Sequence, residues 1–229
     1  MTLRASIVIP CFNERNTIDE LIDRVQAVPV DKEVIVVDDR STDGTRELLQ
    51  KRLSERADII LRLRERNGGK GAAVQDGLKC ASGDVVIIQD ADLEYDPADY
   101  PLLLRPIQTG RARVVYGSRF IGEHRAMYFW HSLGNKFLTL LCNALFDTTL
   151  TDMETCYKVF TIDIARQLKL REPRWGFDPE ITARVLKMGH RIYEVPISYA
   201  GREFDEGKKI SWRDGFVVLL TLLRYRFLP

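Results

Sequence analysis

The first half of the chain alternates between short apolar runs and longer amphipathic segments. Four runs rich in Val, Ile or Leu are expected to be strands: residues 5–10, 33–39, 57–64 and 84–90. The segments between them are expected to be helices: residues 16–27, 43–55 and 69–82. Strands of nearly continuous Val and Ile, separated by helices, predict a parallel sheet that helices cover on both faces.

After residue 112 the pattern changes. The expected elements are a strand and loop (112–120), an aromatic-rich helix (126–146), a loop, short strand and helix (152–168), a helix that Gly189 would cap (178–189), a late strand (191–203) and a last apolar helix (214–229). The chain has no internal repeat and no linker, so one domain is expected.

The composition excludes several classes of protein. With 229 residues, 45% hydrophobic and 29% charged, the chain resembles one soluble globular domain. A net charge of +1 gives no overall attraction to nucleic acid. The cysteines lack zinc-ligand spacing, which predicts reduced thiols in a cytoplasmic protein: Cys11, Cys80, Cys142 and Cys156. No apolar run reaches the roughly 20 residues that span a bilayer, and the N-terminal run is too short for a signal peptide.

Polar residues follow three predicted strands at the point where each strand ends. The loops read PCFNE (residues 10–14), DDRSTD (38–43) and QDADLE (89–94). In parallel sheets, ligands bind in the crevice outside the carboxyl ends of the strands. We therefore expect the three loops to converge on one crevice.

Asp90 is the last residue of the predicted strand 84–90, and Asp92 follows with one residue between them. In an extended chain, residues two apart point the same way, so both carboxylates can face one cation. Hard oxygen ligands suit Mg²⁺ or Mn²⁺, which commonly bind through one or two carboxylates plus substrate phosphates. The alternative is an acidic turn facing water, and the neighbouring polar strand ends favour the metal.

Two further features lie near this pair. Asp39 could accept hydrogen bonds from a nucleobase or ribose, whereas one of residues 41–43 is expected to cap the following helix. Residues 68–71 (Gly-Gly-Lys-Gly) lead into the helix 69–82 and could cradle a phosphate or simply form a flexible helix entry. Their spacing is not that of a P-loop.

Other charged and aromatic residues have simpler interpretations. A solvated helix face is expected for four basic residues: Arg46, Lys51, Arg52 and Arg56. Packing is expected for three rings at the start of the aromatic helix: Phe129, Trp130 and His131. Glu154, Asp178 and Glu180 stay open, although a carboxylate at a helix start usually serves the helix dipole.

Seven motifs in order carry a resemblance to a known family. They are IVIPCFNE, VVDDRSTDGT, NGGKGAAVQDGL, GDVVIIQDADLE, YGSRF, DMETCYKVF and EVPISYAGR. Together they resemble glycosyltransferase family 2, a large inverting family, from about residue 5 to residue 212. The motifs DADLEYDP, GSRF and VPISYAGRE most resemble its polyprenol-phosphate branch, typified by dolichol-phosphate mannose synthase.

The resemblance implies an α/β GT-A fold, which is Rossmann-like, with a mostly parallel sheet and helices on both faces. Residues 1–212 would form the catalytic domain, and residues 213–229 would form an apolar helix that lies at a membrane interface. Arg119 would bind the acceptor phosphate, together with Arg125 or His131. Asp92, Arg119 and Arg202 would be the catalytic residues.

The resemblance also implies the ligand sets. The nucleotide sugar would contact Pro10, Phe12, Glu14, Asp39, Lys70, Asp90, Ala91, Asp92, Arg202 and Lys209, the last two from a closing loop. Mg²⁺ or Mn²⁺ would be held by Asp90, Asp92 and Glu94. Two residues depart from the pattern: Glu94 stands where mannose synthases often have Gln, and Asp178 stands where some members have Lys.

The implied activity is inverting transfer of a sugar from a UDP- or GDP-sugar to a polyprenyl or dolichyl phosphate. A lipid phosphate has a second pKa near ~6, so it is largely dianionic at neutral pH and needs no general base. The alternative acceptor, a sugar hydroxyl of a glycan or glycolipid, needs a base, for which Asp152 and Glu154 are candidates. A non-catalytic nucleotide-sugar-binding subunit is a second alternative, and the intact motif residues argue against it.

The last helix favours work at a membrane surface. Residues 216–223 are apolar except Thr221, and Arg224 to Arg226 follow them directly. Residues 128–130 add three aromatic side chains, which favour a membrane interface. Peripheral association with the cytoplasmic face is therefore expected, with a homo-oligomer or a membrane-protein partner left open. The alternative is that both segments complete the core.

Overall fold

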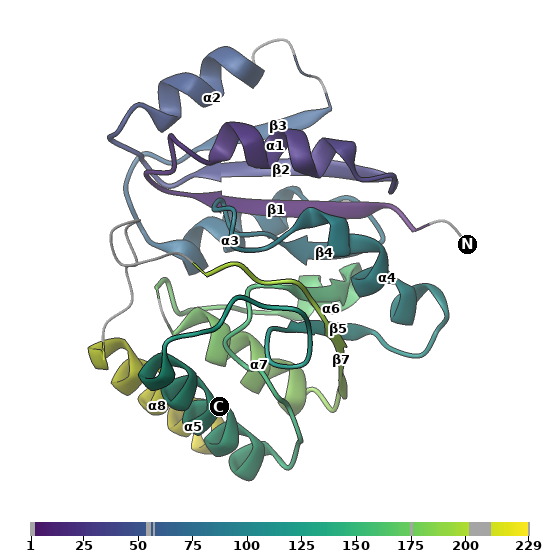
Figure 1. Ribbon diagram of the computed structural model, residues 1–229, viewed down its shortest axis with the longest axis vertical. Helices are drawn as coiled ribbons and strands as arrows, with labels where there is room; N and C mark the ends of the chain where they lie inside the picture. Colours follow the sequence, from purple (N-terminus) through teal and green to yellow (C-terminus); the bar gives the residue numbers. More distant parts are fainter. Residues whose placement is uncertain (1–2, 54–55, 57, 175, 202–211, 229) are drawn as a thin grey trace.

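The computed structural model describes residues 3–53, 56, 58–174, 176–201 and 212–228. In this part of the chain, seven strands form one sheet in the order β3-β2-β1-β4-β6-β5-β7 (Figure 1). The strands are β1 (Ala5–Cys11), β2 (Lys32–Asp38), β3 (Ile59–Leu63), β4 (Val85–Ile88), β5 (Val114–Ser118), β6 (Lys158–Thr161) and β7 (Ile192–Pro196). Every strand expected from the sequence is present.

The sheet is mostly parallel, as predicted, and β6 is the exception. Strand β1 pairs in parallel with β2 and β4, and β5 pairs in parallel with β7. Strand β6 is antiparallel to both neighbours, with Val159 opposite Ile87 and Val115. The apolar residues of β6 predict a buried strand, but their pattern carries no information on its direction.

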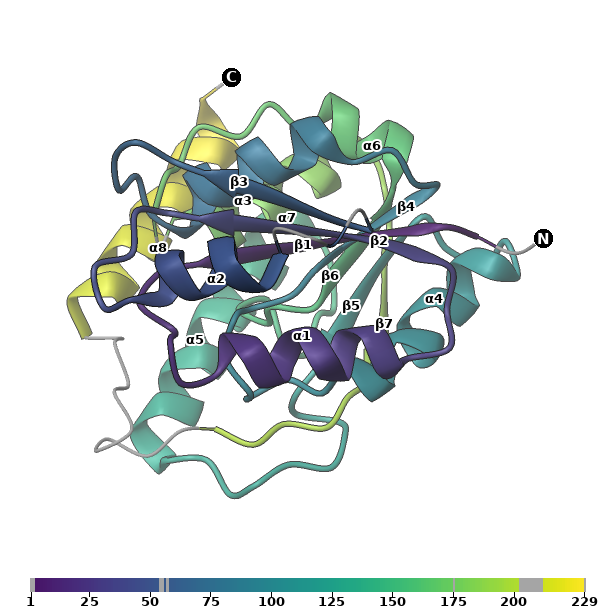
Figure 2. The ribbon, with the colours of Figure 1, turned by 90° about the horizontal axis from the view of Figure 1, so that it is seen from above.

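The helices cover both faces of the sheet (Figure 2). They are α1 (Ile18–Ala27), α2 (Thr45–Leu53), α3 (Lys70–Cys80), α4 (Tyr100–Gln108), α5 (Phe129–Phe146), α6 (Ile162–Gln167), α7 (Phe177–Lys187) and α8 (Trp212–Phe227), with a short 3₁₀ helix η1 (Pro97–Asp99) before α4. Helices α1 and α4 lie on one face, and α3, α6 and α7 lie on the other. This arrangement confirms the predicted layers.

Helix α4 is absent from the sequence prediction. Its Pro101 lies in the first turn, where a proline is tolerated because that N–H has no partner within the helix. Pro106 lies inside the helix, where proline normally signals a break. The buried residues Leu103, Leu104 and Ile107 nevertheless hold the helix against the sheet.

Helix α7 ends as the sequence predicted. Gly189 has a φ of 81°, and its N–H donates to Leu186 O at 3.0 Å. The N–H of His190 donates to Val185 O at 3.2 Å. These two bonds form a Schellman cap, which favours glycine because a side chain is strained at positive φ.

Helices α5 and α8 pack on each other and on α7, beyond the end of the main sheet (Figure 1). A small second core joins them through Cys142, Met153, Val218 and Leu222. The four cysteines are free thiols, as predicted. Among the described helices, none combines the length and apolar character that crossing a bilayer requires.

Candidate active site

The loops after β1, β2 and β4 lie together at one edge of the sheet, as the sequence predicted. Asn13 donates its main-chain N–H to Ser41 Oγ at 2.9 Å, and its side-chain oxygen accepts the N–H of Thr42 at 2.8 Å. Thr17 Oγ1 donates to Ala91 O at 3.0 Å. These bonds join loops from three adjacent strands, so their polar side chains can act on one ligand.

Pro10, Phe12 and Glu14 lie at the carboxyl end of β1. Pro10 occupies a central strand, a position that proline rarely takes because it has no N–H to donate. Strand β4 pairs with β1 only as far as Val8, so the ladder needs no donor from Pro10 on that side. Phe12 is 38% exposed, and the main-chain N–H of Glu14 donates to Thr45 Oγ1 at 3.1 Å. Their contact with a nucleoside stays a prediction.

Asp39 follows β2 and holds the glycine-rich loop that precedes α3. Its buried carboxylate accepts the N–H of Gly68 at 2.9 Å and the N–H of Gly69 at 2.6 Å, and it pairs with Arg64. The two glycine N–H groups considered for a phosphate therefore bind an internal carboxylate in this structure. Arg64, which follows β3, was missed, although its place just beyond a strand end is a signal that could have found it.

Asp90, Asp92 and Glu94 form the acidic loop after β4. Asp90 pairs with Lys70 Nζ at 2.8 Å, and the Asp92 carboxylate accepts the N–H of Glu94 at 3.2 Å. The N–H of Asp90 donates to Cys156 Sγ at 3.1 Å, and Ala91 between the two aspartates is buried. The loop thus carries three carboxylates, and one of them, Asp90, pairs with Lys70.

These carboxylates suit a hard divalent cation if a substrate supplies the remaining ligands. Within the described residues, no three His, Cys, Asp or Glu side chains gather closely enough to hold a metal ion unaided. Mg²⁺ characteristically binds through one or two carboxylates while substrate phosphates complete its ligands. The donor chemistry of Asp90, Asp92 and Glu94 suits that mode, and their assignment as ligands stays a prediction.

Lys70 belongs to a chain of alternating charges that runs beneath the acidic loop. The buried Lys158 Nζ lies 2.6 Å from Asp178 Oδ1, and Lys70 Nζ lies 3.8 Å from Asp178 Oδ2. Burial alone would raise the pKa of Asp178, but Lys158 and Lys70 hold it below its usual value. Burial would likewise lower the pKa of Lys70, but Asp178 and Asp90 raise it. Asp178 therefore pairs with two lysines, and it also lies in the first turn of α7, where a carboxylate is favoured by the helix dipole.

Arg119, from the GSR motif after β5, forms a two-pronged ion pair with Asp152. Arg119 Nε and Nη2 donate to the Asp152 carboxylate at 2.7 and 2.8 Å, and the Arg119 N–H donates to it at 3.0 Å. Although burial alone would lower it, Asp152 raises the pKa of Arg119. Asp152 is fully buried, and its charge is committed to the arginine. It is therefore a poor candidate for a general base.

Glu154, two residues further, has a different environment. Its Oε1 atom is buried and has no hydrogen-bond partner in the described part of the chain. Burial, with a further contribution from the Asp178 carboxylate, raises the pKa of Glu154 to about 8. The environment of Glu154 therefore favours its protonated form.

Glu154→Gln is expected to change how stability depends on pH. The unfolded carboxyl ionises near 4.5 and the folded one near 8, so the folded protein holds an extra proton between these values. Stability of the wild type should fall as pH rises through this window, because ionisation then favours the unfolded chain. The variant lacks this penalty, so its Tm should exceed the wild-type Tm by several degrees more at pH 8 than at pH 5.

Thermal melting of both proteins from pH 4.5 to 9 checks this expectation. Exposed Glu123→Gln is the matched control and should track the wild type. Parallel curves for Glu154→Gln and the wild type would mean that Glu154 is ionised in the folded protein.

The remaining predicted phosphate ligands are placed only in part. Arg125 is exposed, and its N–H donates to Tyr199 O at 3.0 Å. His131 lies in the first turn of α5 with its ring 5.9 Å from that of Tyr128. A role of Arg125 or His131 at the acceptor phosphate stays a prediction. Arg202 and Lys209 lie outside the described residues.

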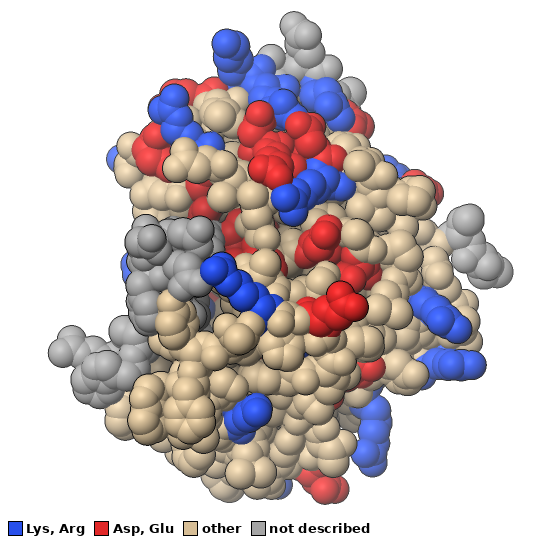
Figure 3. Space-filling view, in the orientation of Figure 1, with Lys and Arg blue, Asp and Glu red and all other residues tan. Residues whose placement is uncertain are grey.

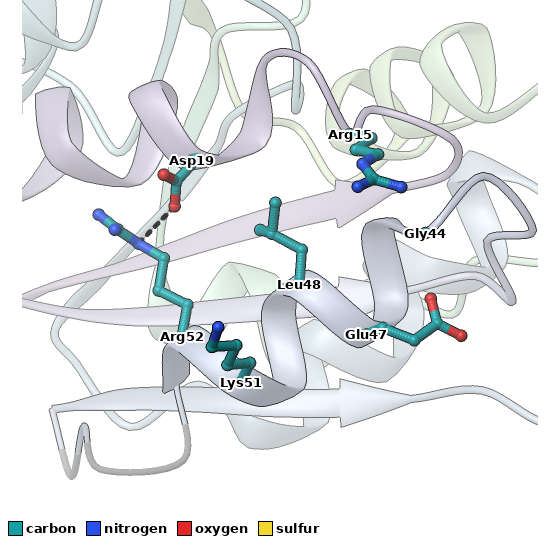
Figure 4. Close-up of a pocket in the computed structure, with 7 residues that line it drawn as sticks. All are labelled: Arg15, Asp19, Gly44, Glu47, Leu48, Lys51 and Arg52. Carbon is teal, nitrogen blue, oxygen red and sulfur yellow. Dashed lines mark ion pairs between the residues drawn. The ribbon is translucent and has the colours of Figure 1, made fainter.

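The basic face predicted for α2 is largely paired rather than solvated. Arg46 Nε binds the buried carboxylate of Asp38 at 2.7 Å, because the turn after β2 brings α2 back over the strand end. Arg52 bridges to α1 through Asp19 at 2.6 Å and Asp23 at 2.5 Å. Figure 4 shows Arg52 reaching Asp19 across a groove of about 660 Å³ between the two helices. This groove lies apart from the acidic loop.

The packing expected for Phe129 and Trp130 at the start of α5 is wrong. Phe129 is 68% exposed and Trp130 is 76% exposed, and His131 is half-buried. Further exposed apolar residues continue along α5 and α8: Leu133, Phe137, Leu140, Phe216, Val217, Leu220 and Phe227. Figure 3 shows the lower part of the molecule as a surface with few charged side chains. We call these nine residues the apolar face of α5 and α8.

The chain is similar to one protein family and to several named relatives. A sequence model described as Glycosyl transferase family 2 matches residues 6–169. Undecaprenyl-phosphate mannosyltransferase of Micrococcus luteus is 29% identical over 90% of this chain and 87% of the relative. Dodecaprenyl-phosphate galacturonate synthase of Rhizobium johnstonii is 30% identical over 99% of this chain and 67% of the relative. Undecaprenyl-phosphate 4-deoxy-4-formamido-L-arabinose transferase of Salmonella paratyphi A is 31% identical over 90% of this chain, which spans only 62% of that relative.

Solved structures share the same fold. Glucosyl-3-phosphoglycerate synthase from Mycobacterium tuberculosis, in complex with Mn²⁺, UDP and glucosyl-3-phosphoglycerate, superposes with a TM-score of 0.75 at 23% identity. That match covers 99% of this chain and 81% of the other. The same synthase in complex with Mg²⁺ and UDP gives a TM-score of 0.74 at 23% identity, over 99% and 80% of the two chains. The predicted GT-A fold is confirmed.

Proposed function

We propose, because the chain belongs to glycosyl transferase family 2, that this glycosyltransferase moves a sugar from a UDP- or GDP-sugar to a polyprenyl phosphate. The three named relatives support the acceptor, since each is described as a transferase or synthase that acts on undecaprenyl or dodecaprenyl phosphate. The names of these relatives mention no nucleotide donor, so a UDP- or GDP-sugar is proposed from the family resemblance alone.

The observation that carries the proposal is the pairing of Arg119 with Asp152. The pair holds a cation at the motif that the family resemblance assigns to the acceptor phosphate. The same pair occupies the Asp152 carboxylate with three donors from Arg119. An arginine at this motif suits a dianionic phosphate, which needs no deprotonation.

The proposed step is a direct displacement at the anomeric carbon. An oxygen of the acceptor phosphate attacks that carbon while its bond to the nucleoside diphosphate breaks, so its configuration inverts. Arg119 would align the acceptor phosphate, and Lys70 would balance charge on the leaving diphosphate. Lys70 lies between Asp90 and Asp178, so it is already directed toward the acidic loop.

A divalent cation completes the proposed site. Asp90, Asp92 and Glu94 would hold Mg²⁺ or Mn²⁺ with the donor diphosphate, and the bound ion would offset negative charge on the leaving group. Pro10, Phe12, Glu14 and Asp39 would hold the nucleoside. Arg202 and Lys209, outside the described residues, are proposed for the loop that closes over the donor.

One observation favours a second candidate function. A carboxyl with a pKa near 8 is close to the working pH, which is where a general base is effective. Glu154 could therefore deprotonate a sugar hydroxyl of a glycan or glycolipid. That reading predicts a rate that rises with pH up to about 8, whereas transfer to a phosphate should level off above its second pKa near ~6.

A screen of donors and acceptors tests the proposal. UDP-, GDP- and dTDP-sugars are each incubated with a polyprenyl phosphate or with a glycan acceptor, and lipid-linked and glycan-linked products are quantified. The proposal expects lipid-linked product from a UDP- or GDP-sugar. Glycan-linked product alone would favour the hydroxyl acceptor.

We also propose that the apolar face of α5 and α8 lies on the cytoplasmic surface of a membrane. A polyprenyl phosphate presents its head group there, and an apolar helix face can lie in the interface plane. Arg224 and Arg226, both exposed near the end of α8, suit the headgroup region. An exposed apolar face of this extent is unusual for a freely soluble monomer.

Liposome flotation of a face variant tests this proposal. Trp130→Ser with Phe137→Ser should reduce co-flotation with anionic vesicles about tenfold or more, because it removes two large exposed side chains from the interface. The variant is preferable to a chain ending at Asp214, which would also remove Val218 and Leu222 from the small core. Tyr193→Ser, 41% exposed on β7, is the matched control and should float like the wild type. Wild-type protein that stays at the bottom of the gradient would rule out the interfacial role.

A further inference from the structure

Tyr199, which follows β7, lies between the acidic loop and the loop after the GSR motif. Its N–H donates to Glu123 O at 3.0 Å, and its carbonyl accepts the N–H of Arg125 at 3.0 Å. The next residue, Ala200, donates its N–H to Glu94 O at 2.9 Å. The backbone around Tyr199 thus joins two loops. The family resemblance assigns the acidic loop to the nucleotide-sugar donor and the GSR loop to the acceptor phosphate.

The side chain of Tyr199 makes the same connection. Its hydroxyl donates to Glu94 Oε2 at 3.0 Å. Its ring faces the guanidinium of Arg119, whose central carbon lies 5.3 Å from the ring centroid. A tyrosine hydroxyl is protonated at neutral pH, so it acts as the donor to the carboxylate. One side chain therefore contacts a carboxylate of the acidic loop and the buried arginine.

Neighbouring contacts fix the position of this ring. Ser198 donates its N–H and its hydroxyl to Asp99 Oδ2 at 2.9 and 2.7 Å. The ring of Tyr95 packs edge-on against Tyr199, with centroids 5.3 Å apart. Because the backbone and the ring are both held, the hydroxyl can restrain Glu94 rather than follow it.

We propose that Tyr199 is a positioning residue that fixes Glu94 through its hydroxyl and Arg119 through its ring. The inference rests on the proposed function, in which Glu94 helps to hold the cation and Arg119 binds the acceptor phosphate. Loss of an outer partner of a metal ligand typically weakens metal affinity or activity about 10–100-fold. A ring beneath a cation contributes less. The hydroxyl and the ring should therefore have separable effects.

Two variants separate the hydroxyl from the ring. Tyr199→Phe keeps the ring, so Mn²⁺ should bind about tenfold more weakly in the presence of UDP or GDP, while the KM for polyprenyl phosphate stays within about twofold. Tyr199→Leu removes both contacts and should also raise that KM about fivefold. Tyr193→Phe, on β7 and away from the loops, is the matched control. Mn²⁺ binding is followed by electron paramagnetic resonance without any acceptor, and circular dichroism checks the fold of each variant.

A double variant distinguishes positioning from a general structural effect. In a Glu94→Ala background, Tyr199→Phe should change Mn²⁺ affinity by no more than about twofold, because the side chain that the hydroxyl restrains is already absent. An equal loss in both backgrounds would overturn the proposal, and so would Mn²⁺ affinity in Tyr199→Phe that equals the wild type.

The binding measurement also separates this inference from the proposed function. Weaker Mn²⁺ binding by Tyr199→Phe, in a protein that makes no lipid-linked product, would support the contact to Glu94 and reject the polyprenyl phosphate acceptor. Normal transfer to polyprenyl phosphate, with Mn²⁺ binding and acceptor KM unchanged in both variants, would support the proposed acceptor and reject the positioning role of Tyr199. Wild-type protein that binds no Mn²⁺ with either nucleotide would overturn the inference.

Discussion

Asp92→Asn is expected to lower turnover by about 10²–10³-fold or more while leaving the Tm within a degree or two of the wild type. Asp92 is half-buried in the acidic loop, where its carboxylate accepts the N–H of Glu94. An asparagine can still accept that bond through its side-chain oxygen, and it has nearly the same volume. The substitution therefore removes a negative charge without opening a cavity, so its effect should fall on cation binding and not on folding.

Asp96→Asn, a few residues further on, is the matched control. Asp96 also accepts a nearby main-chain N–H, from Ala98 at 2.9 Å, but it caps the 3₁₀ helix η1. This control should keep near wild-type turnover. Steady-state assays with and without excess EDTA complete the comparison, and full activity in EDTA would reject the metal assignment.

Arg119→Ala is expected to lower both stability and transfer. Removing the arginine leaves the carboxylate of Asp152 buried without its counter-ion, and breaking a buried pair in this way typically costs about 3–5 kcal/mol. Transfer to polyprenyl phosphate should fall as well, because the cation proposed to align the acceptor is lost. Denaturant unfolding measures the first effect, and the KM for the acceptor measures the second.

A paired substitution separates these two effects. Arg119→Met with Asp152→Asn removes both charges and keeps an acceptor for the Arg119 main-chain N–H. This double variant should regain much of the lost stability, since no unpaired charge stays buried. It should not regain transfer to the lipid phosphate. Near wild-type transfer by a stable double variant would mean that Arg119 acts only in folding.

The elements that position the site follow from the sequence because their physics is local. The strands ending at Cys11, Asp38 and Ile88 each contain a run of apolar residues, and polar residues begin where each run stops. Parallel strands bring such ends to one edge, so the convergence of their loops could be predicted without coordinates. The family motifs then gave each loop an expected ligand.

The pairings within the site do not follow from the sequence, because they join residues far apart in the chain. Lys158 and Asp178 come from β6 and α7, and nothing in either segment indicates its partner. The direction of β6 is likewise invisible in its four residues, Lys158–Thr161. Arg46 has the spacing of an exposed helix face, yet the path of the turn before α2 places it on Asp38.

The exposed side of α5 and α8 could not be predicted from the sequence either. The spacing of Phe129, Trp130 and Phe137 predicts a helix that buries apolar side chains, but it does not say what covers them. In the structure, the inner side of α5 supplies Cys142 to the small core, while these three residues stay exposed. A sequence pattern gives the helix, and only the fold gives the exposed side.

A comparison of two acceptors tests the central claim most directly. The protein is incubated with its best nucleotide sugar and either a polyprenyl phosphate or the polyprenol of the same length, and lipid-linked sugar and released nucleoside diphosphate are both quantified. Our account predicts one nucleoside diphosphate released for each sugar-phosphate-lipid formed, no product from the polyprenol, and a rate that is level between pH 7 and 8.5. Product from a hydroxyl acceptor alone, at a rate that rises toward pH 8, would contradict it.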